Sequence, residues 1–210
     1  MNTTDTPYHS DAVRRQIVDA AHERFRHYGY QKTTMAEVAR DVGMSAANLY
    51  RYFRNKLEIA TACAGRYVSE RHEVLHQVIH LPGKTARARL ESFALAAFRH
   101  TRKHATEQPR INDLFESVTR ARHDLLDTQY ESEQGMIADV LAQGNESKEF
   151  DVKDILGAAR AIHTALLFFS LPRFATPYPA AELEQVASAI VGLMVLGLAR
   201  RQPDRAPLNN

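Results

Sequence analysis

The chain is short of several features, and each shortage excludes a class of protein. Its single cysteine, Cys63, cannot form an intramolecular disulfide, which suits a reducing compartment and a buried small apolar side chain. The 210 residues contain no Gly-rich phosphate loop, no paired-cysteine metal site and no G-x-S-x-G elbow. These absences exclude several common enzyme and cofactor motifs, and we expect neither catalysis nor a bound cofactor.

Long apolar runs are also missing. The longest, Val186 to Ala199, is shorter than the roughly 20 residues needed to cross a bilayer. The first residues, MNTTDTPYHSDAVRR, contain no apolar segment and do not resemble a signal peptide. With 44% hydrophobic and 25% charged residues, the composition is that of a soluble globular protein. We expect a cytoplasmic protein without membrane association.

Positive charge is unevenly distributed along the chain. Residues 1–56 contain nine Lys/Arg and six Asp/Glu, a net +3, whereas residues 57–210 contain eighteen and nineteen, a net −1. A small positive excess at one end is compatible with a nucleic-acid-binding segment there. It is too small to indicate a strong non-specific nucleic-acid binder.

The hydrophobic pattern is helical throughout, with no sustained β alternation. A first helix is expected from Asp11 to Tyr28, and a long one from Lys56 to the break at Leu81-Pro82-Gly83. Later helical segments are expected at 85–106, 109–122, 123–144, 152–172 and 180–201. We therefore predict an all-α fold of about nine helices, in which the long helix connects two domains.

Residues 33–58 carry the most specific pattern. Thr34 and Glu37 form a capping box, and the helix that they start is stopped by Gly43. Ser45 is placed to cap a second short helix, and Asn55 with Glu58 starts a third. Two short helices about a glycine turn, followed by a long one, predict a helix-turn-helix.

In such a unit the second helix enters the DNA major groove. Asn48 can bond an adenine edge and Arg51 a guanine or a phosphate, whereas tyrosine hydroxyls and lysine fix the helix on the backbone. The residues that we predict to contact DNA are Thr33, Thr34, Ser45, Ala46, Ala47, Asn48, Tyr50, Arg51, Tyr52 and Lys56. The alternative interpretation is that residues 33–58 are three amphipathic helices of an ordinary helical domain that does not bind DNA.

Residues 12–60 resemble the TetR family of transcriptional regulators. Ahead of the motif, the resemblance is carried by Arg15, Ile17, Ala20, Ala21, Phe25 and Gly29. Within it, the resemblance is carried by Thr33, Thr34, Val38, Ala39, Gly43, Ser45, Leu49, Tyr50, Phe53 and Lys56. The resemblance implies a homodimeric one-component regulator, usually a repressor, which binds a palindromic operator and is released by a small-molecule effector. Asn48 and Leu57 depart from the usual residues, which affects only the expected operator sequence.

The last two helical segments are apolar over a wide arc. Helices of this kind must be covered on both sides. Either the two form an internal pair in a monomer, or they meet the same pair of a second subunit in a four-helix interface. The family resemblance favours the homodimer.

The larger domain is rich in aromatic residues interleaved with polar ones, as a small-molecule site requires. The effector-binding residues that we predict are Phe98, Phe115, Gln129, Tyr130, His163 and Phe168. Each aromatic taken singly also fits an ordinary core. Among the polar residues, His163 is the strongest candidate for contacting an effector. The equal alternative is that His163 is a core histidine whose hydrogen bonds are made within the protein.

One motif points to another function. His72, Glu73 and His76 form a literal H-E-x-x-H, with His80 one turn further, as in zinc proteases. The four-letter match is weakly specific, and solvated histidines on a helix face are the favoured interpretation, so no metal residue is predicted. The alternative function is a helical small-molecule or metal-binding protein without a DNA-binding role.

These predictions divide the chain into four parts. Residues 1–10 are expected to be a flexible arm and residues 11–56 the DNA-binding domain. Residues 57–202 are expected to bind the effector and to dimerise, and residues 203–210 to form a flexible tail.

Overall fold

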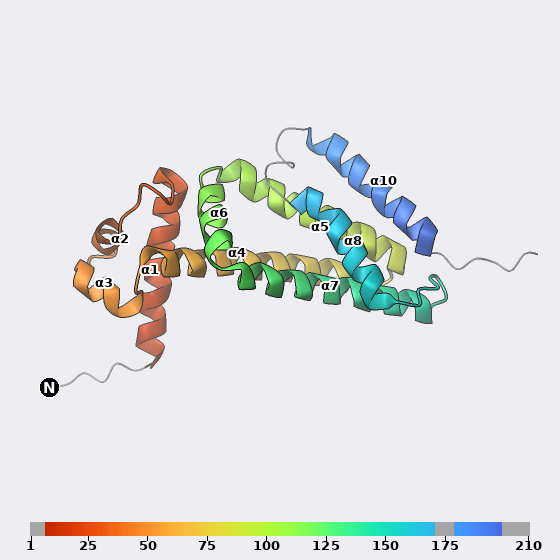
Figure 1. The fold of residues 1–210 in the computed structure, drawn as a ribbon, viewed down its shortest axis with the longest axis horizontal. Coiled ribbons are helices and arrows are strands. Elements are labelled where there is room, and N and C mark those ends of the chain that lie inside the picture. Colours follow the sequence, from red (N-terminus) through yellow and green to blue (C-terminus); the bar gives the residue numbers. More distant parts are fainter. Residues whose placement is uncertain (1–6, 171–178, 199–210) are drawn as a thin grey trace, which may run out of the picture. The chain divides into compact units, whose positions relative to one another are not determined.

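The computed structural model describes residues 7–170 and 179–198, and within these ranges it consists of helices joined by short connections (Figure 1). The helices are α1 (Pro7–Tyr28), α2 (Met35–Asp41), α3 (Ala46–Tyr52), α4 (Lys56–Ile79), α5 (Ala86–Glu107), α6 (Ile111–Ala121), α7 (His123–Glu146), α8 (Ile155–Ser170) and α10 (Ala180–Leu198). The all-α prediction is confirmed, and each predicted helical segment has its counterpart.

The ends of some helices differ from the prediction. α1 begins at Pro7, so the last four residues of the predicted arm are helical, since proline fits the first turn of a helix. α7 continues through Gly144 to Glu146. The remaining arm, residues 1–6, and the predicted tail lie outside the described residues.

The chain forms two compact units, one from residues 1–71 and 102–129 and the other from residues 72–101 and 130–210. The first is larger than the predicted domain of residues 11–56, because it also takes in α4 as far as Arg71 and all of α6. Leu114 and Val118 of α6 are buried in the same core as α1. Three short helices cannot bury enough apolar surface alone, and these residues complete the core.

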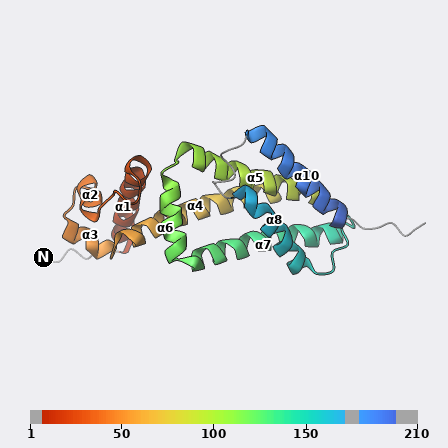
Figure 2. The ribbon, with the colours of Figure 1, turned by 45° about the horizontal axis from the view of Figure 1, so that its top comes forward.

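In the first unit, α2 and α3 lie side by side and both belong to the layer next to α1 (Figures 1 and 2). Their shared core is fully buried and comprises Ile17, Ala21, Phe25, Val38, Ala39, Leu49, Phe53 and Ile59. Cys63 is buried beside them, and burial raises the pKa of its thiol to about 12. This agrees with the predicted role of Cys63 as a small apolar side chain, because a thiol so shifted stays protonated.

Two glycines set the turns of this unit. Gly29 ends α1 with φ +88°, and Gly43 lies between α2 and α3 with φ +68°. These left-handed conformations are strained for residues with a Cβ atom. Gly43 shapes the turn between α2 and α3 that a helix-turn-helix needs, and Gly29 ends α1 ahead of the α1–α2 connection.

The second unit has its own apolar core. Its buried side chains include Leu75, Leu90, Phe93, Phe98, Ile137, Leu141, Ile162, Leu166, Ala187 and Val191. The first turn of α5 is closed by the carboxylate of Glu149, which accepts hydrogen bonds from the N–H groups of Ala86 (2.8 Å) and Arg87 (2.9 Å). The loop after α7 therefore caps α5 from about sixty residues away in sequence.

Gly144 allows that loop to fold back on α7. A Cβ atom at this position would lie 2.2 Å from a ring carbon of Phe150, far closer than atoms can approach. The backbone N–H groups of Glu149 and Phe150 both donate to the carbonyl of Gly144. The glycine that the sequence suggests as a helix end is thus a site of close approach by an aromatic ring.

α10 shows two different apolar faces. Leu183, Ala187, Val191 and Val195 recur every fourth residue and are buried in the core. The other side exposes Val186, Leu193 and Leu196. By length and composition alone α10 could span a membrane, contrary to the prediction from the shorter apolar run. The buried stripe is that of a helix packed on a protein core.

Candidate nucleic-acid interface

The second helix of the helix-turn-helix, α3, has one buried side and one exposed side. The hydroxyl of Ser45 accepts a hydrogen bond from the N–H of Asn48 at 3.1 Å, which caps the helix as predicted. Leu49 is fully buried, and Ala47, Tyr50 and Arg51 are exposed. Residues three and four apart share one face of a helix, so these three side chains form a single outward surface.

Asn48 lies at the edge of that surface. It is half-buried, and its amide oxygen lies 3.5 Å from Nη1 of Arg51. Its amide nitrogen lies 4.0 Å from the sulfur of Met44. The two groups with the clearest base-reading chemistry are therefore neighbours, one turn apart on α3.

Thr33 and Thr34, both predicted to contact DNA, differ in position. Thr34 is exposed and caps α2, since its hydroxyl accepts from the N–H of Glu37 and its own N–H donates back to the Glu37 carboxylate at 2.8 Å. Thr33 is only 1% exposed, and its hydroxyl donates to the carbonyl of Gly29 at 3.0 Å. The side chain of Thr33 thus closes the α1–α2 connection, and its contact with DNA stays a prediction.

Lys56 also has an internal partner. Its ammonium donates to the carbonyls of Tyr30 (2.8 Å) and Gln31 (3.3 Å) and lies 4.4 Å from the centre of the Tyr30 ring. Burial lowers the pKa of this ammonium, and the Glu37 carboxylate partly offsets that effect. Lys56 therefore ties the start of α4 to the α1–α2 connection, and its predicted contact with a DNA phosphate stays a prediction.

Arg14 of α1 holds the end of α3. Its guanidinium donates to the main-chain carbonyl of Tyr52 and lies 4.1 Å from the centre of the Phe53 ring. A cation over an aromatic face is an attractive contact. Tyr52 is half-buried against the core, so its side chain is less available than that of Tyr50, which is 52% exposed.

Arg24 joins α1 to α2 in the same way. Its guanidinium donates to the carboxylate of Asp41, with one bond of 3.1 Å, and lies 3.4 Å from a carboxylate oxygen of Glu37. These bonds lower the pKa of Asp41, chiefly through the hydrogen bond from Arg24. The pKa of Glu37 is lowered chiefly by the hydrogen bonds from Thr34. Sequence analysis missed both arginines, because their partners are set by tertiary packing.

The residues predicted to bind an effector divide between the two units. In the second unit, Nε2 of His163 lies 3.2 Å from a carboxylate oxygen of Glu133, and both side chains are buried. The Tyr130 ring lies 5.2 Å from the His163 ring, centre to centre. Phe98 is fully buried in the surrounding apolar core. A buried polar pair within an apolar interior has thus formed around His163.

The other three predicted residues lie elsewhere. Phe115 packs in the core of the first unit, with its ring 4.6 Å from that of Tyr67. Gln129 is half-buried at the end of that unit, and Phe168 is 43% exposed on α8. Glu133 is the partner that sequence analysis missed, since thirty residues separate it from His163 and no local spacing links them.

The H-E-x-x-H segment forms an exposed row on α4. The rings of His72 and His76 stack with centres 6.1 Å apart, and those of His76 and His80 with centres 4.1 Å apart. Glu73 instead accepts a hydrogen bond from the Gln77 amide at 2.8 Å. Stacked, nearly parallel rings do not converge on a common point, as the ligands of a zinc protease must.

Comparison with known proteins agrees with this geometry. The family model described as "Bacterial regulatory proteins, tetR family" matches residues 17–63. The family model described as "Tetracyclin repressor-like, C-terminal domain" matches residues 86–191, just over half of the chain. The first match covers the helix-turn-helix, and the second covers most of the remaining helices.

Two characterised relatives match the N-terminal part. The HTH-type transcriptional repressor Rv1474c of Mycobacterium tuberculosis is 42% identical over 48 residues, which are 23% of this chain and 26% of that protein. The HTH-type transcriptional regulator BetI of Escherichia coli is 33% identical over 89 residues, which are 42% of this chain and 46% of that protein. The chain thus spans less than half the length of these relatives.

Solved structures match over nearly the whole length. A transcriptional regulator from Cytophaga hutchinsonii has a TM-score of 0.71 at 23% identity, covering 90% of this chain and 100% of that one. A TetR/AcrR-family regulator from Thermobifida fusca has a TM-score of 0.68 at 22% identity, with the same coverage. At these identities the similarity shows the fold. Together with the two family models, matched in chain order, it means that the chain belongs to the TetR family of bacterial regulatory proteins.

Proposed function

We propose that the protein is a homodimeric, one-component transcriptional regulator that binds a palindromic DNA operator through α3. The observation that carries this proposal is the outward face of α3, where Ala47, Tyr50 and Arg51 lie opposite the buried Leu49. An alanine methyl can touch a thymine methyl, and an arginine can bond a guanine edge or a phosphate. In this proposal the protein acts in the cytoplasm and is not an enzyme.

The capped turn explains how such a face is held for DNA. Arg14 and Lys56 fix the two ends of the helix-turn-helix to the main chain, and Arg24 fixes α2 to α1. The charged groups of these three side chains therefore bond to other groups of the protein itself. In this proposal, contact with bases and DNA backbone is made by the exposed residues Thr34, Ser45, Ala47, Tyr50 and Arg51 and by the half-buried Ala46 and Asn48.

The dimer is proposed to form through α8 and α10. These two helices contact each other within the second unit and expose large apolar side chains: Leu156, Phe168, Val186, Leu193 and Leu196. Contiguous exposed apolar surface usually marks an interface. A two-fold pairing of α8 and α10 would cover it and would present two α3 helices to two half-sites.

A small-molecule effector is proposed to bind the second unit near Tyr130, Glu133 and His163. The buried His163–Glu133 pair gives this apolar interior a polar group that could recognise a ligand. The effector can release DNA only if it binds the free and the DNA-bound states with different affinity. α4 runs unbroken from the helix-turn-helix into the second unit and is the proposed connection between the two events.

Repression is the favoured direction of regulation, since the relative Rv1474c is named a repressor. In this proposal the ligand-free dimer occupies the operator and the effector releases it.

Gel-shift and anisotropy titrations with DNA flanking the coding region test the proposal. Arg51→Ala and Tyr50→Phe should weaken binding to all sequences and reduce its salt dependence, whereas Asn48→Ala should relax sequence preference. Arg87→Ala removes an equally exposed arginine from the second unit and serves as the control. The rival function, a helical ligand- or metal-binding protein, gains support if no complex forms even at low salt.

A further inference from the structure

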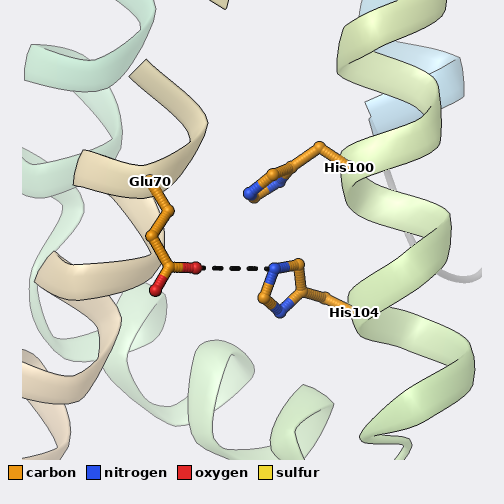
Figure 3. A group of neighbouring side chains, drawn as sticks. All are labelled: Glu70, His100 and His104. Carbon is orange, nitrogen blue, oxygen red and sulfur yellow. Dashed lines mark ion pairs between the residues drawn. The ribbon is translucent and has the colours of Figure 1, made fainter. Parts of the chain in front are cut away.

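Glu70 of α4 and His104 of α5 form an ion pair within the first unit. Nε2 of His104 lies 3.7 Å from a carboxylate oxygen of Glu70. His100 lies one turn before His104 on the same uninterrupted helix, so helix geometry places both imidazoles on one face. Figure 3 shows both rings directed toward the Glu70 carboxylate.

The three side chains can bring one ligand atom each to a common point. Two imidazole nitrogens and a carboxylate oxygen all lie within 4.8 Å of one another. In a tetrahedral site with bonds of about 2.1 Å, the ligand atoms are separated by roughly 3.4 Å, so small side-chain rotations would bring these three atoms to bonding positions. Among the residues that the structure describes, no other group of three such ligands comes together.

Aromatic contacts hold the ring of His104 in place. The ring lies edge-on to Tyr67 with centres 4.9 Å apart, and Tyr67 in turn packs against Phe115. The imidazole is therefore fixed beside Glu70 by packing within the first unit.

We propose that Glu70, His100 and His104 form a binding site for a divalent first-row transition ion, with Zn²⁺ as the best match. Two imidazoles and one carboxylate are the ligand types that zinc accepts, and they leave a fourth position for water or an anion. A bound ion would join α4 to α5. This site is separate from the H-E-x-x-H row and does not depend on the proposed DNA-binding function.

Zinc titration of the tag-free, chelator-treated full-length protein tests the site, using calorimetry and competition with a chromophoric chelator. Wild type should bind one equivalent of Zn²⁺. Glu70→Gln and His104→Ala should each weaken binding at least about tenfold, since even outer-shell changes at metal sites cost that much. Because Glu70 is exposed, its variant keeps the fold. Co²⁺ in the same site should give the absorption bands of a low-coordinate complex in wild type only.

His76→Ala is the matched control, because it removes an exposed histidine of the same helix. It should leave the zinc affinity unchanged within about twofold. Saturating Zn²⁺ should raise the melting temperature of wild type and of this control, but not that of Glu70→Gln. The proposal is overturned if wild type binds no stoichiometric zinc, or if His76→Ala loses the ion while Glu70→Gln retains it.

Discussion

α3 and α10 each bury one stripe and expose the opposite side, but their exposed sides differ in chemistry. α3 exposes Ala47, Tyr50 and Arg51, two of which can form hydrogen bonds. α10 exposes leucine and valine, with Leu193 70% and Leu196 71% exposed. The buried stripe shows how a helix is held, whereas the exposed stripe shows what it can bind. A polar stripe fits a nucleic acid, and an apolar one fits another protein surface.

The largest effect is expected from changes on the exposed apolar side of α10. Replacing Leu193 and Leu196 with glutamate places four charges in the proposed two-fold interface, which should weaken dimerisation on the order of 1000-fold. Sedimentation velocity should show a monomer whose helical circular dichroism is unchanged. A dimer that persists in this double variant would move the interface away from α10.

The second effect separates the two stripes of α3. Leu49→Ala removes a fully buried side chain and should lower the free energy of unfolding by about 3 kcal/mol. Its neighbour Tyr50→Ala should change that free energy by less than about 0.5 kcal/mol while weakening DNA binding. Urea denaturation, followed beside anisotropy titrations, measures both quantities. Equal stability losses in the two variants would contradict the assignment of faces.

The third effect distinguishes a lysine that stabilises the fold from one that contacts DNA. Lys56→Met keeps the aliphatic stem but removes the bonds to the Tyr30 and Gln31 carbonyls, and should cost about 1.5 kcal/mol of stability. The salt dependence of DNA binding should stay as in wild type, because this ammonium is used inside the fold. If instead the salt slope drops while stability is unchanged, Lys56 is a phosphate contact after all.

The smallest effect concerns the pairing of Arg24 with Asp41, which joins α1 to α2. The pKa of Asp41 is lowered in the folded state by Arg24, so its stabilising contribution is present above the unfolded pKa of about 4. That contribution is lost as the pH falls through the lower folded pKa. Wild type should therefore melt above Asp41→Asn at pH 7, and the two should converge as the pH falls below the folded pKa of Asp41. A difference that stays constant with pH would exclude this origin.

The helix-turn-helix shows which features sequence analysis could predict and which it could not. The caps at Thr34 and Ser45 were predictable because each joins residues three apart in the chain. The internal hydrogen bonds of Thr33 and Lys56 were not, because they depend on where the α1–α2 connection lies in space.

The polar clusters of the interior and of α4–α5 were beyond sequence analysis for the same reason. His163 stood out as a histidine in an apolar segment, but its partner Glu133 lies thirty residues away. Glu70 and His104 are separated by the last turns of α4, a loop and most of α5. The contiguous motif at His72–His76, in contrast, forms an exposed row of side chains. Local spacing predicts caps and helix faces, and tertiary packing decides which polar groups meet.

The contact between Gly144 and Phe150 has an evolutionary consequence. Because the aromatic ring occupies the space where a Cβ atom would stand, position 144 can accept alanine only after position 150 has become smaller. The two sites should therefore change together among descendants of this chain, and in a fixed order. A lineage that alters the glycine first must displace the ring of Phe150 from its present position.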